Sequence, residues 1–189
     1  MYQEFFHYLK TAFVPFLDAS VYGRSILENS SFIASSAHMD ARLHGTGYVS
    51  RLTGASAEML TMWRMMTVGQ APFVLNANGE LNMVLDPKLP GWLFTDAEKQ
   101  AVILKETGEQ SFCQPDSTFA FCLLGSIVVI YYNDEHLDTY EEGVQVTKII
   151  LCQEWEAKVC LEGSVIPAPY AEKVRMGEYD TIKAVVSRV

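Results

Sequence analysis

The chain has 189 residues, of which 49% are hydrophobic and 20% are charged. This composition is typical of a folded globular protein and unlike that of a disordered one. The net charge is −9, with 14 Lys and Arg against 23 Asp and Glu, so counterion release at a phosphate backbone would not favour binding. We therefore expect no nucleic-acid partner.

The sequence lacks the signals of a membrane or secreted protein. No apolar run approaches the roughly 20 residues that a bilayer-spanning helix requires. Residues 1–10 carry Glu4 and His7 among their aromatic side chains, unlike a signal peptide. We expect a cytoplasmic protein with no membrane partner.

The four cysteines form no C-x-x-C pair, and no histidine lies at zinc-ligand spacing from them. This pattern predicts reduced, structural thiols and no metal site. Three of them lie in apolar, strand-like runs, where a thiol behaves as a small hydrophobic group. The fourth, Cys113, is expected in a polar loop.

Residues 1–69 show apolar positions at helical spacing. Phe5, Leu9 and Phe13 trace one face of a first helix, and Pro15 is expected to end or kink it. A second helix is predicted to begin near Thr53, with Gly69 as its left-handed C-terminal cap. Its apolar positions include Met59, Met62 and Met66.

A long polar segment, residues 20–50, lies between these helices. It is rich in Ser, Gly, Asn and His, and it is longer than a routine connection between helices. Ordered loops of this length carry function more often than ordinary connections do.

From Ala71 onward the apolar residues alternate or cluster in short runs, which predicts β-strands. Hairpins are expected around Asn78-Gly79 and around Gly125-Ser126, whose flanking strands (residues 119–124 and 127–132) should form the centre of the sheet. Further strands are expected at residues 144–150, 157–161 and 182–186. Residues 95–118 should form an excursion with one helical turn near residues 101–104.

These patterns predict a mixed α and β protein with two domains. Residues 1–69 form an α-helical segment with a long polar loop, and residues 70–189 form an antiparallel β-sandwich, which we favour over a barrel.

The step Thr53-Gly54 at the start of the second helix is the most informative local feature. A helix start leaves backbone N–H groups unpaired and concentrates partial positive charge, so it can hold a phosphate. Gly54 would let an anion approach the backbone, because it has no side chain. From the residues alone, an ordinary Thr N-cap explains the same step, and it is the commoner case.

The polar segment offers further candidates. His44 and an arginine (Arg24 or Arg42) could give charge-assisted hydrogen bonds to a phosphate or to sugar hydroxyls. For any one of these residues, a solvated loop position is the favoured reading. For the segment as a whole, its density of polar groups makes a functional role about as well supported.

Four runs resemble a known family. Residues 22–36 (YGRSILENSSFIASS) and 43–54 (LHGTGYVSRLTG) resemble the end of the catalytic domain of the cellobiose phosphorylase family, glycoside hydrolase family 94. Residues 89–94 (LPGWLF) and 163–174 (GSVIPAPYAEKV) resemble its C-terminal sandwich. The resemblance is strongest to the branch of β-1,2-oligoglucan phosphorylases and cyclic β-1,2-glucan synthases, with residues 95–118 as the main departure.

This resemblance implies a fold and an activity. Residues 1–69 would be the last helices and active-site loop of an (α/α)6 toroid. The family cleaves a β-glucosidic bond with inorganic phosphate and inversion, giving glucose 1-phosphate without a cofactor. Its phosphate-binding Thr-Gly pair matches Thr53 and Gly54, and His44 is a weaker candidate for its phosphate-binding histidine.

The family's general acid has no counterpart among these residues. It is an aspartate in a glycine- and tryptophan-flanked motif, and neither Asp18 nor Asp40 lies in such a motif. We therefore assign no catalytic residue and expect the chain to be inactive alone, as a C-terminal fragment or subunit. In the parent enzyme the partners would be a β-glucan oligosaccharide and phosphate.

Two further expectations follow. The apolar helix faces would lack their toroid neighbours, so the chain should self-associate or pair with the missing toroid portion. The alternative function is a non-catalytic carbohydrate-binding or structural β-sandwich, in which Trp92, Trp155 or Tyr170 could stack on sugars. For each of these three residues, packing in the core or in a turn is the favoured reading.

Overall fold

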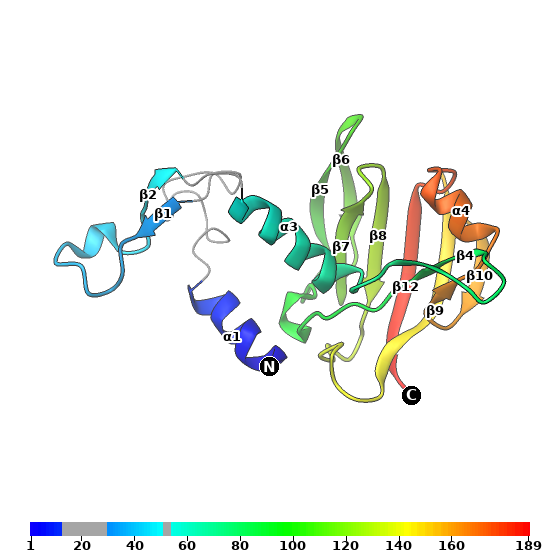
Figure 1. Ribbon diagram of the computed structural model, residues 1–189, viewed down its shortest axis with the longest axis horizontal. Coiled ribbons are helices and arrows are strands. Elements are labelled where there is room, and N and C mark those ends of the chain that lie inside the picture. The colour runs from blue at the N-terminus through cyan, green and yellow to red at the C-terminus, as the bar shows by residue number, and fades with distance from the viewer. Residues whose placement is uncertain (13–29, 51–53) are drawn as a thin grey trace. The chain divides into compact units, whose positions relative to one another are not determined.

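The computed structural model describes residues 1–12, 30–50 and 54–189, and Figure 1 shows their elements in chain order. These residues form two compact units, Met1–Trp63 and Arg64–Val189. Helix α3, Gly54–Thr67, begins in the first unit and ends in the second. The second unit thus starts earlier than the expected boundary near Gly69, because the last turn of α3 belongs with the strands.

The first unit contains helix α1, Tyr2–Ala12, and a small hairpin. Strands β1, Ser30–Ile33, and β2, Gly47–Ser50, pair antiparallel, and the 3-10 helix η2, Ala41–Leu43, lies in the loop between them. The described part of the polar segment is therefore an ordered hairpin with a long loop. In α1 the buried side chain is Phe6, while Phe5 and Leu9 are half-buried.

Helix α3 begins and ends close to where its sequence pattern predicts. Gly69 follows it with a φ of +111°, and its N–H donates to the Arg64 carbonyl oxygen at 3.2 Å. A Cβ at Gly69 would lie 3.1 Å from the Cβ and carbonyl oxygen of Asp86. Gly69 is therefore required both for the left-handed turn and for the close approach of the next segment.

The second unit is built on a five-stranded sheet in the order β10-β9-β12-β8-β7. Its strands are β7 (Thr118–Leu123), β8 (Ile127–Tyr132), β9 (Val144–Gln153), β10 (Glu156–Glu162) and β12 (Thr181–Arg188).

The central strand of this sheet is β12, so the expectation that β7 and β8 form its centre is wrong. Strand β7 lies at one edge of the sheet. An edge strand can be apolar here because the β5–β6 hairpin covers one of its faces. Strand β12 pairs parallel with β8 and antiparallel with β9. The sheet is therefore mixed, and not purely antiparallel as expected.

The two faces of this sheet are covered differently. One face, here called the core face, carries Ile127, Val129 and Tyr131 of β8, which are fully buried. Register places Ile182 and Ala184 of β12 on the same face. Since the side chains of a strand alternate between faces, Val128 and Ile130 point to the opposite face, here called the hairpin face.

The hairpin face is covered by strands β5, Lys99–Lys105, and β6, Gly108–Gln114. Ile103 of β5 and Phe112 of β6 pack against Val128 and Ile130. The expected helical turn in this region is therefore wrong, as is the polar loop expected around Cys113, which lies in β6. Ala101 and Ile103 point inward while Val102 is exposed, which is the alternation of a strand.

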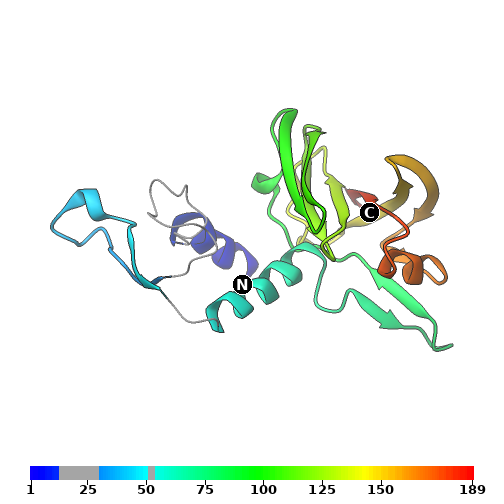
Figure 2. The same cartoon turned by 90° about the horizontal axis from the view of Figure 1, so that it is seen from above.

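A three-stranded sheet and helix α4, Tyr170–Arg175, complete the second unit. The sheet has the order β11-β4-β3, with β3 Phe73–Leu75, β4 Leu81–Val84 and β11 Val165–Ile166. A short 3-10 helix η3, Gly91–Leu93, follows β4. Figure 2 shows the β5–β6 hairpin and the β3–β4 strands on opposite sides of the five-stranded sheet.

Both predicted hairpins form. Strands β3 and β4 pair around Gly79, which has a φ of +79°, and the Asn76 side-chain oxygen accepts hydrogen bonds from the N–H groups of Asn78 and Glu80. Strands β7 and β8 turn through Leu124 and Gly125, both with positive φ. The described chain is thus a mixed α and β fold of mostly antiparallel strands with few helices.

Candidate functional site

Of the predicted phosphate-binding residues, Gly54 is the first residue of α3. Thr53 lies outside the described residues. A 14-residue helix that starts at Gly54 directs its first backbone N–H groups away from the helix body, where they have no intrahelical acceptor. The helix macrodipole adds partial positive charge at the same end.

His44 closes the 3-10 helix η2 and is half-buried. Its Nε2 atom lies 2.9 Å from the His38 carbonyl oxygen, and its backbone N–H donates to the Ala41 carbonyl oxygen at 3.3 Å. Since a carbonyl only accepts, Nε2 must carry the proton of this hydrogen bond. Nδ1 is then the ring atom left for a ligand, as an acceptor in neutral His44 and as a donor in the protonated form.

The arginine near His44 in this loop, Arg42, is already paired with Asp40. The guanidinium of Arg42 donates to both carboxylate oxygens of Asp40, at 3.0 Å and 2.8 Å. These hydrogen bonds hold the pKa of Asp40 below its usual value and raise that of Arg42. Arg42 is therefore bound to a carboxylate in the described structure, and the other candidate, Arg24, lies outside the described residues.

Backbone hydrogen bonds hold this loop in shape. Gly45 adopts a φ of +82°, and its N–H donates to Ala34, while the Ala34 N–H donates to Thr46. The structure thus describes two pieces of the predicted phosphate site, an ordered loop with His44 and a helix that starts at Gly54.

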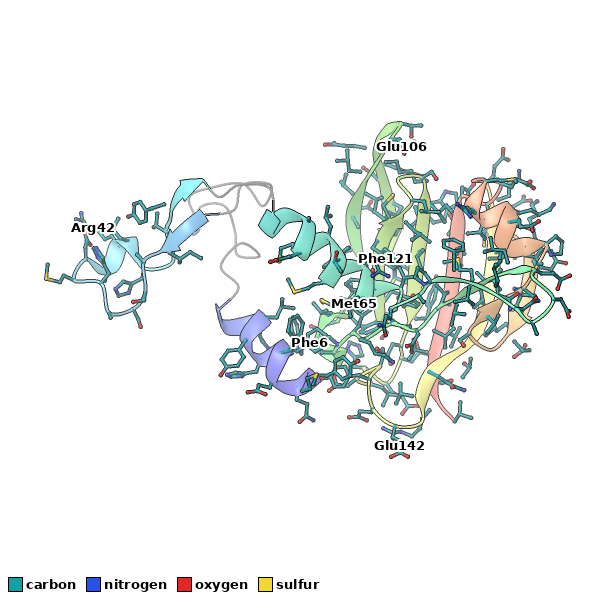
Figure 3. All side chains as sticks on the ribbon, in the orientation of Figure 1. Phe6, Arg42, Met65, Glu106, Phe121 and Glu142 are labelled. Atoms are coloured by element: carbon teal, nitrogen blue, oxygen red, sulfur yellow. The ribbon has the colours of Figure 1, made fainter. Side chains whose placement is uncertain are left out.

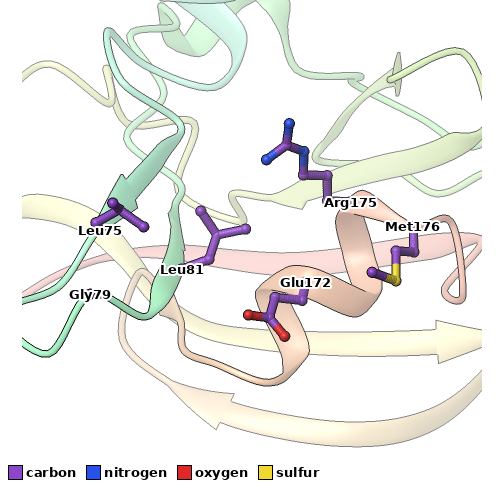
Figure 4. A pocket seen from close by; sticks show the side chains of 6 residues that line it. All are labelled: Leu75, Gly79, Leu81, Glu172, Arg175 and Met176. Atoms are coloured by element: carbon purple, nitrogen blue, oxygen red, sulfur yellow. The ribbon is translucent and has the colours of Figure 1, made fainter.

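A shallow cavity of about 470 Å³ lies in the second unit, between the β3–β4 hairpin and α4. Figure 4 shows the side chains that line it, which are Leu75, Gly79, Leu81, Glu172, Arg175 and Met176. Leu75 and Leu81 face each other in the hairpin register. No histidine, cysteine or serine is among these lining residues, so the cavity offers an apolar surface with two charges and no nucleophile.

The turn between β9 and β10 contains two consecutive non-glycine residues with positive φ. Only Glu154 and Trp155 separate the paired residues Gln153 and Glu156, and both turn residues have positive φ, +51° and +66°. Two-residue turns of this type strongly prefer Asn-Gly. A non-glycine residue in such a conformation costs on the order of 1–3 kcal/mol, and such strain clusters at functional sites.

Two contacts hold this turn. The Glu154 N–H donates to the Oδ2 atom of Asp180, whose own backbone N–H donates to Cys152. The Trp155 ring stacks on Phe112 of β6, with centroids 5.7 Å apart and planes at 29°. Trp155 nevertheless remains 37% exposed. Asp180 Oδ1 and Thr181 Oγ1, beside this turn, are buried without a hydrogen-bond partner among the described residues.

The β5–β6 hairpin covers the hairpin face over β7 and β8. The part of this face next to the β9–β10 turn extends past the hairpin. Register places Ile150 and Lys148 of β9 beside Lys183 and Val185 of β12 on the hairpin face. All four are half-buried, whereas their neighbours on the core face are fully buried. We call these four residues the open half of the hairpin face.

The two lysines of the open half form no ion pair among the described residues, although Glu162 of β10 lies opposite Lys148 in the strand register. Within the described ranges neither ammonium group forms a hydrogen bond. The positive charge of Lys183 acts on Cys152, which lies on the same face, although burial dominates and raises the pKa of the Cys152 thiol. The open half therefore combines hydrogen-bond donors with apolar side chains and ends near Trp155.

The sequence patterns predict little of this surface. The sequence predicts a sugar-stacking role for Trp155, but no local pattern marks Phe112, Lys148 or Lys183. The available signal was a two-residue gap without Gly or Asn between two strand-like runs. Of the other aromatic candidates, Trp92 is 44% exposed in η3 and Tyr170 is half-buried at the start of α4.

The four cysteines are free thiols in the structure, and Cys113 and Cys160 are exposed. For Cys113 a hydrogen bond with Glu98 raises the thiol pKa, which disfavours the reactive thiolate. Among the described residues, no helix is both long and apolar enough to cross a membrane.

Comparisons of the chain with protein-family models, with curated proteins and with solved structures found no match.

Proposed function

We propose that this chain is the C-terminal part of an inverting glycoside phosphorylase and contributes part of its phosphate site. The observation that supports this most directly is the start of α3 at Gly54, directly after Thr53. The run that contains these residues resembles the phosphate-binding segment of the cellobiose phosphorylase family. A helix start without a blocking side chain suits a phosphate dianion.

Each candidate residue has a defined role in this proposal. The first N–H groups of α3 donate to phosphate oxygens, Gly54 allows their approach, and the Thr53 hydroxyl donates one further hydrogen bond. His44 contributes through Nδ1, since its Nε2 atom is engaged by His38. The phosphate then attacks the anomeric carbon of a β-glucoside with inversion, giving glucose 1-phosphate.

The general acid of this reaction comes from elsewhere in the parent enzyme. A general acid typically contributes about a hundred- to ten-thousandfold to the rate. No aspartate of this sequence lies in a matching motif, so the isolated chain binds phosphate but does not cleave the substrate. The toroid helices that carry the acid would also complete the sugar cleft around residues 1–69.

Equilibrium binding of inorganic phosphate tests the site. We expect weak, saturable binding by the chain, reduced by Gly54→Val because a branched side chain would block the helix start. The matched control is Thr61→Val, further along α3, which adds no side chain at the helix start and should leave binding unchanged. A phosphorolysis assay should give no glucose 1-phosphate. Phosphate binding that Gly54→Val leaves intact would contradict the proposal.

A second function, carbohydrate binding without catalysis, is favoured by one observation. Trp155 is held in a strained turn, stacked on Phe112, and still exposes part of its ring. An exposed flat aromatic ring is a suitable surface for the apolar face of a sugar.

A further inference from the structure

The β9–β10 turn and the open half of the hairpin face lie at the same end and on the same side of the five-stranded sheet. Cys152, which pairs with Thr181 at the start of β12, joins them. The turn follows Gln153 directly, and Lys183 lies two residues beyond Thr181 on the same face. Trp155 and the open half therefore lie next to each other along the sheet, with the fully buried Cys152 between them.

The conformation of the turn needs an explanation beyond folding. An Asn-Gly pair would form the same two-residue turn without strain, yet the chain places Glu154 and Trp155 there with φ of +51° and +66°. The Asp180 carboxylate holds the turn through the backbone N–H of residue 154, and any residue except proline would provide this N–H. What Trp155 adds is a large flat ring that is only partly covered.

The area beside Trp155 does not resemble a surface for another protein. Lys148 and Lys183 alternate with Ile150 and Val185 on adjacent strands, so no extended apolar patch forms. The core of a protein–protein interface is depleted of lysine. The combination present here is one flat aromatic ring beside unpaired donor groups.

This combination matches the chemistry of a pyranose ring. A pyranose has a flat face of C–H groups that packs on an aromatic ring, and hydroxyl groups at its edge that accept hydrogen bonds from ammonium groups. We infer that the area formed by Trp155, Lys183, Lys148, Ile150 and Val185 is a binding surface for an oligosaccharide, with one sugar ring stacked on Trp155. The inference rests on the second function proposed above, and the phosphate site at α3 is tested independently of it.

Calorimetric titration of the full chain tests this surface. The ligands are neutral β-glucan oligosaccharides with β-1,2, β-1,3 or β-1,4 linkages, and an acidic oligogalacturonate. We expect binding of at least one of them. The double variant Glu154→Asn/Trp155→Gly should keep its fold, because it installs the preferred turn, and should lose about tenfold or more in affinity with the stacked ring. Lys183→Met keeps the long side chain without its charge and should lose about threefold or more.

Trp92→Phe is the matched control, since Trp92 is similarly exposed but lies in η3, and it should bind like the unmodified chain. Tighter binding of the acidic ligand that Lys183→Met abolishes would assign the ammonium group to a carboxylate. Equal affinity for neutral and acidic ligands would assign it to hydroxyl groups. The inference is overturned if none of the four ligands binds, or if the folded double variant binds as tightly as the unmodified chain.

Discussion

The two faces of the five-stranded sheet carry side chains from the same strands but meet different surroundings. On the core face, Ile149 and Leu151 of β9 are fully buried. On the hairpin face, Ile150 between them is only half-buried, because the β5–β6 hairpin packs on β7 and β8. Figure 3 shows the dense side chains of this unit around Phe121, whose ring stacks on that of Tyr131.

This difference separates the residues that stabilise the fold from those that are free to bind. The core face contributes stability through buried apolar area and one buried hydrogen bond, from the Tyr131 hydroxyl to the Thr67 carbonyl oxygen at 2.8 Å. The hairpin face contributes less beyond the β5–β6 hairpin and exposes charged groups. Substitutions on the two faces should therefore affect different measurements.

The largest effect is expected on the free energy of unfolding, when neighbouring residues on opposite faces of the sheet are replaced by alanine. Leu151→Ala removes a fully buried side chain and should lower the free energy of unfolding by about 2–5 kcal/mol. Ile150→Ala removes a half-buried one and should cost about 1 kcal/mol. Chemical denaturation of both variants measures the difference. Equal costs would mean that the hairpin face is as well covered as the core face.

A smaller effect is expected from the buried tyrosine of the core face. Burial raises the pKa of Tyr131 far above the ordinary value of 10.0, whereas the unfolded chain loses this proton near pH 10. The stability that the neutral phenol contributes is thus present below pH 10 and falls above it, by about 1.4 kcal/mol per pH unit. Tyr131→Phe should cost about 1–3 kcal/mol at neutral pH and reduce this alkaline loss.

The matched control for Tyr131 is Tyr8→Phe, because Tyr8 is 54% exposed on α1. It should change neither the stability at neutral pH nor its alkaline slope. Denaturation curves recorded between pH 8 and 11 would decide, and an unchanged slope in Tyr131→Phe would show that its phenol is not buried in solution.

The next smaller effect is expected on self-association of the chain, which should be weak and should depend on α3. Met66 packs within the second unit, so it is not part of an exposed helix face as expected, whereas Leu60 and Met65 are 71% and 42% exposed. We expect light scattering to show a concentration-dependent mass that Leu60→Gln/Met65→Gln reduces. A monodisperse monomer at high concentration would contradict this expectation.

The smallest effect is expected in the first unit, at the exposed Asp40–Arg42 ion pair. Its hydrogen bonds lower the pKa of Asp40, so any stability it contributes is present above the ordinary pKa of the carboxyl and is lost as the pH falls through the lowered value. Exposed pairs contribute little because water screens them. Asp40→Asn should therefore leave the thermal unfolding midpoint unchanged within error, and a clear drop would show that the pair orders the loop.

Local patterns in the sequence predicted those elements that local chemistry determines. Gly69 required a left-handed turn after α3, and Gly79 and Gly125 required hairpin turns, so these three boundaries could be read from single residues. Strands β9, β10 and β12 could be found because their apolar residues form short runs between turn signals.

Features that depend on distant pairing could not be predicted in the same way. The position of β12 between β8 and β9 depends on the crossover through α4, which no local pattern encodes. Residues 99–105 form a strand because they pair with residues 108–114, although their apolar run also fits a helical turn. The contact of Trp155 with Phe112 likewise joins two hairpins that are far apart in sequence.

The most direct test of the functional account is a pair of NMR titrations of the backbone amides. Inorganic phosphate should shift the amide signals of residues 54–57 at the start of α3 and leave the second unit unchanged. The oligosaccharide that binds in calorimetry should instead shift residues 153–156 and Lys183. Phosphate shifts spread over the surface, or absent from the start of α3, would contradict the claim that this helix holds part of a phosphate site.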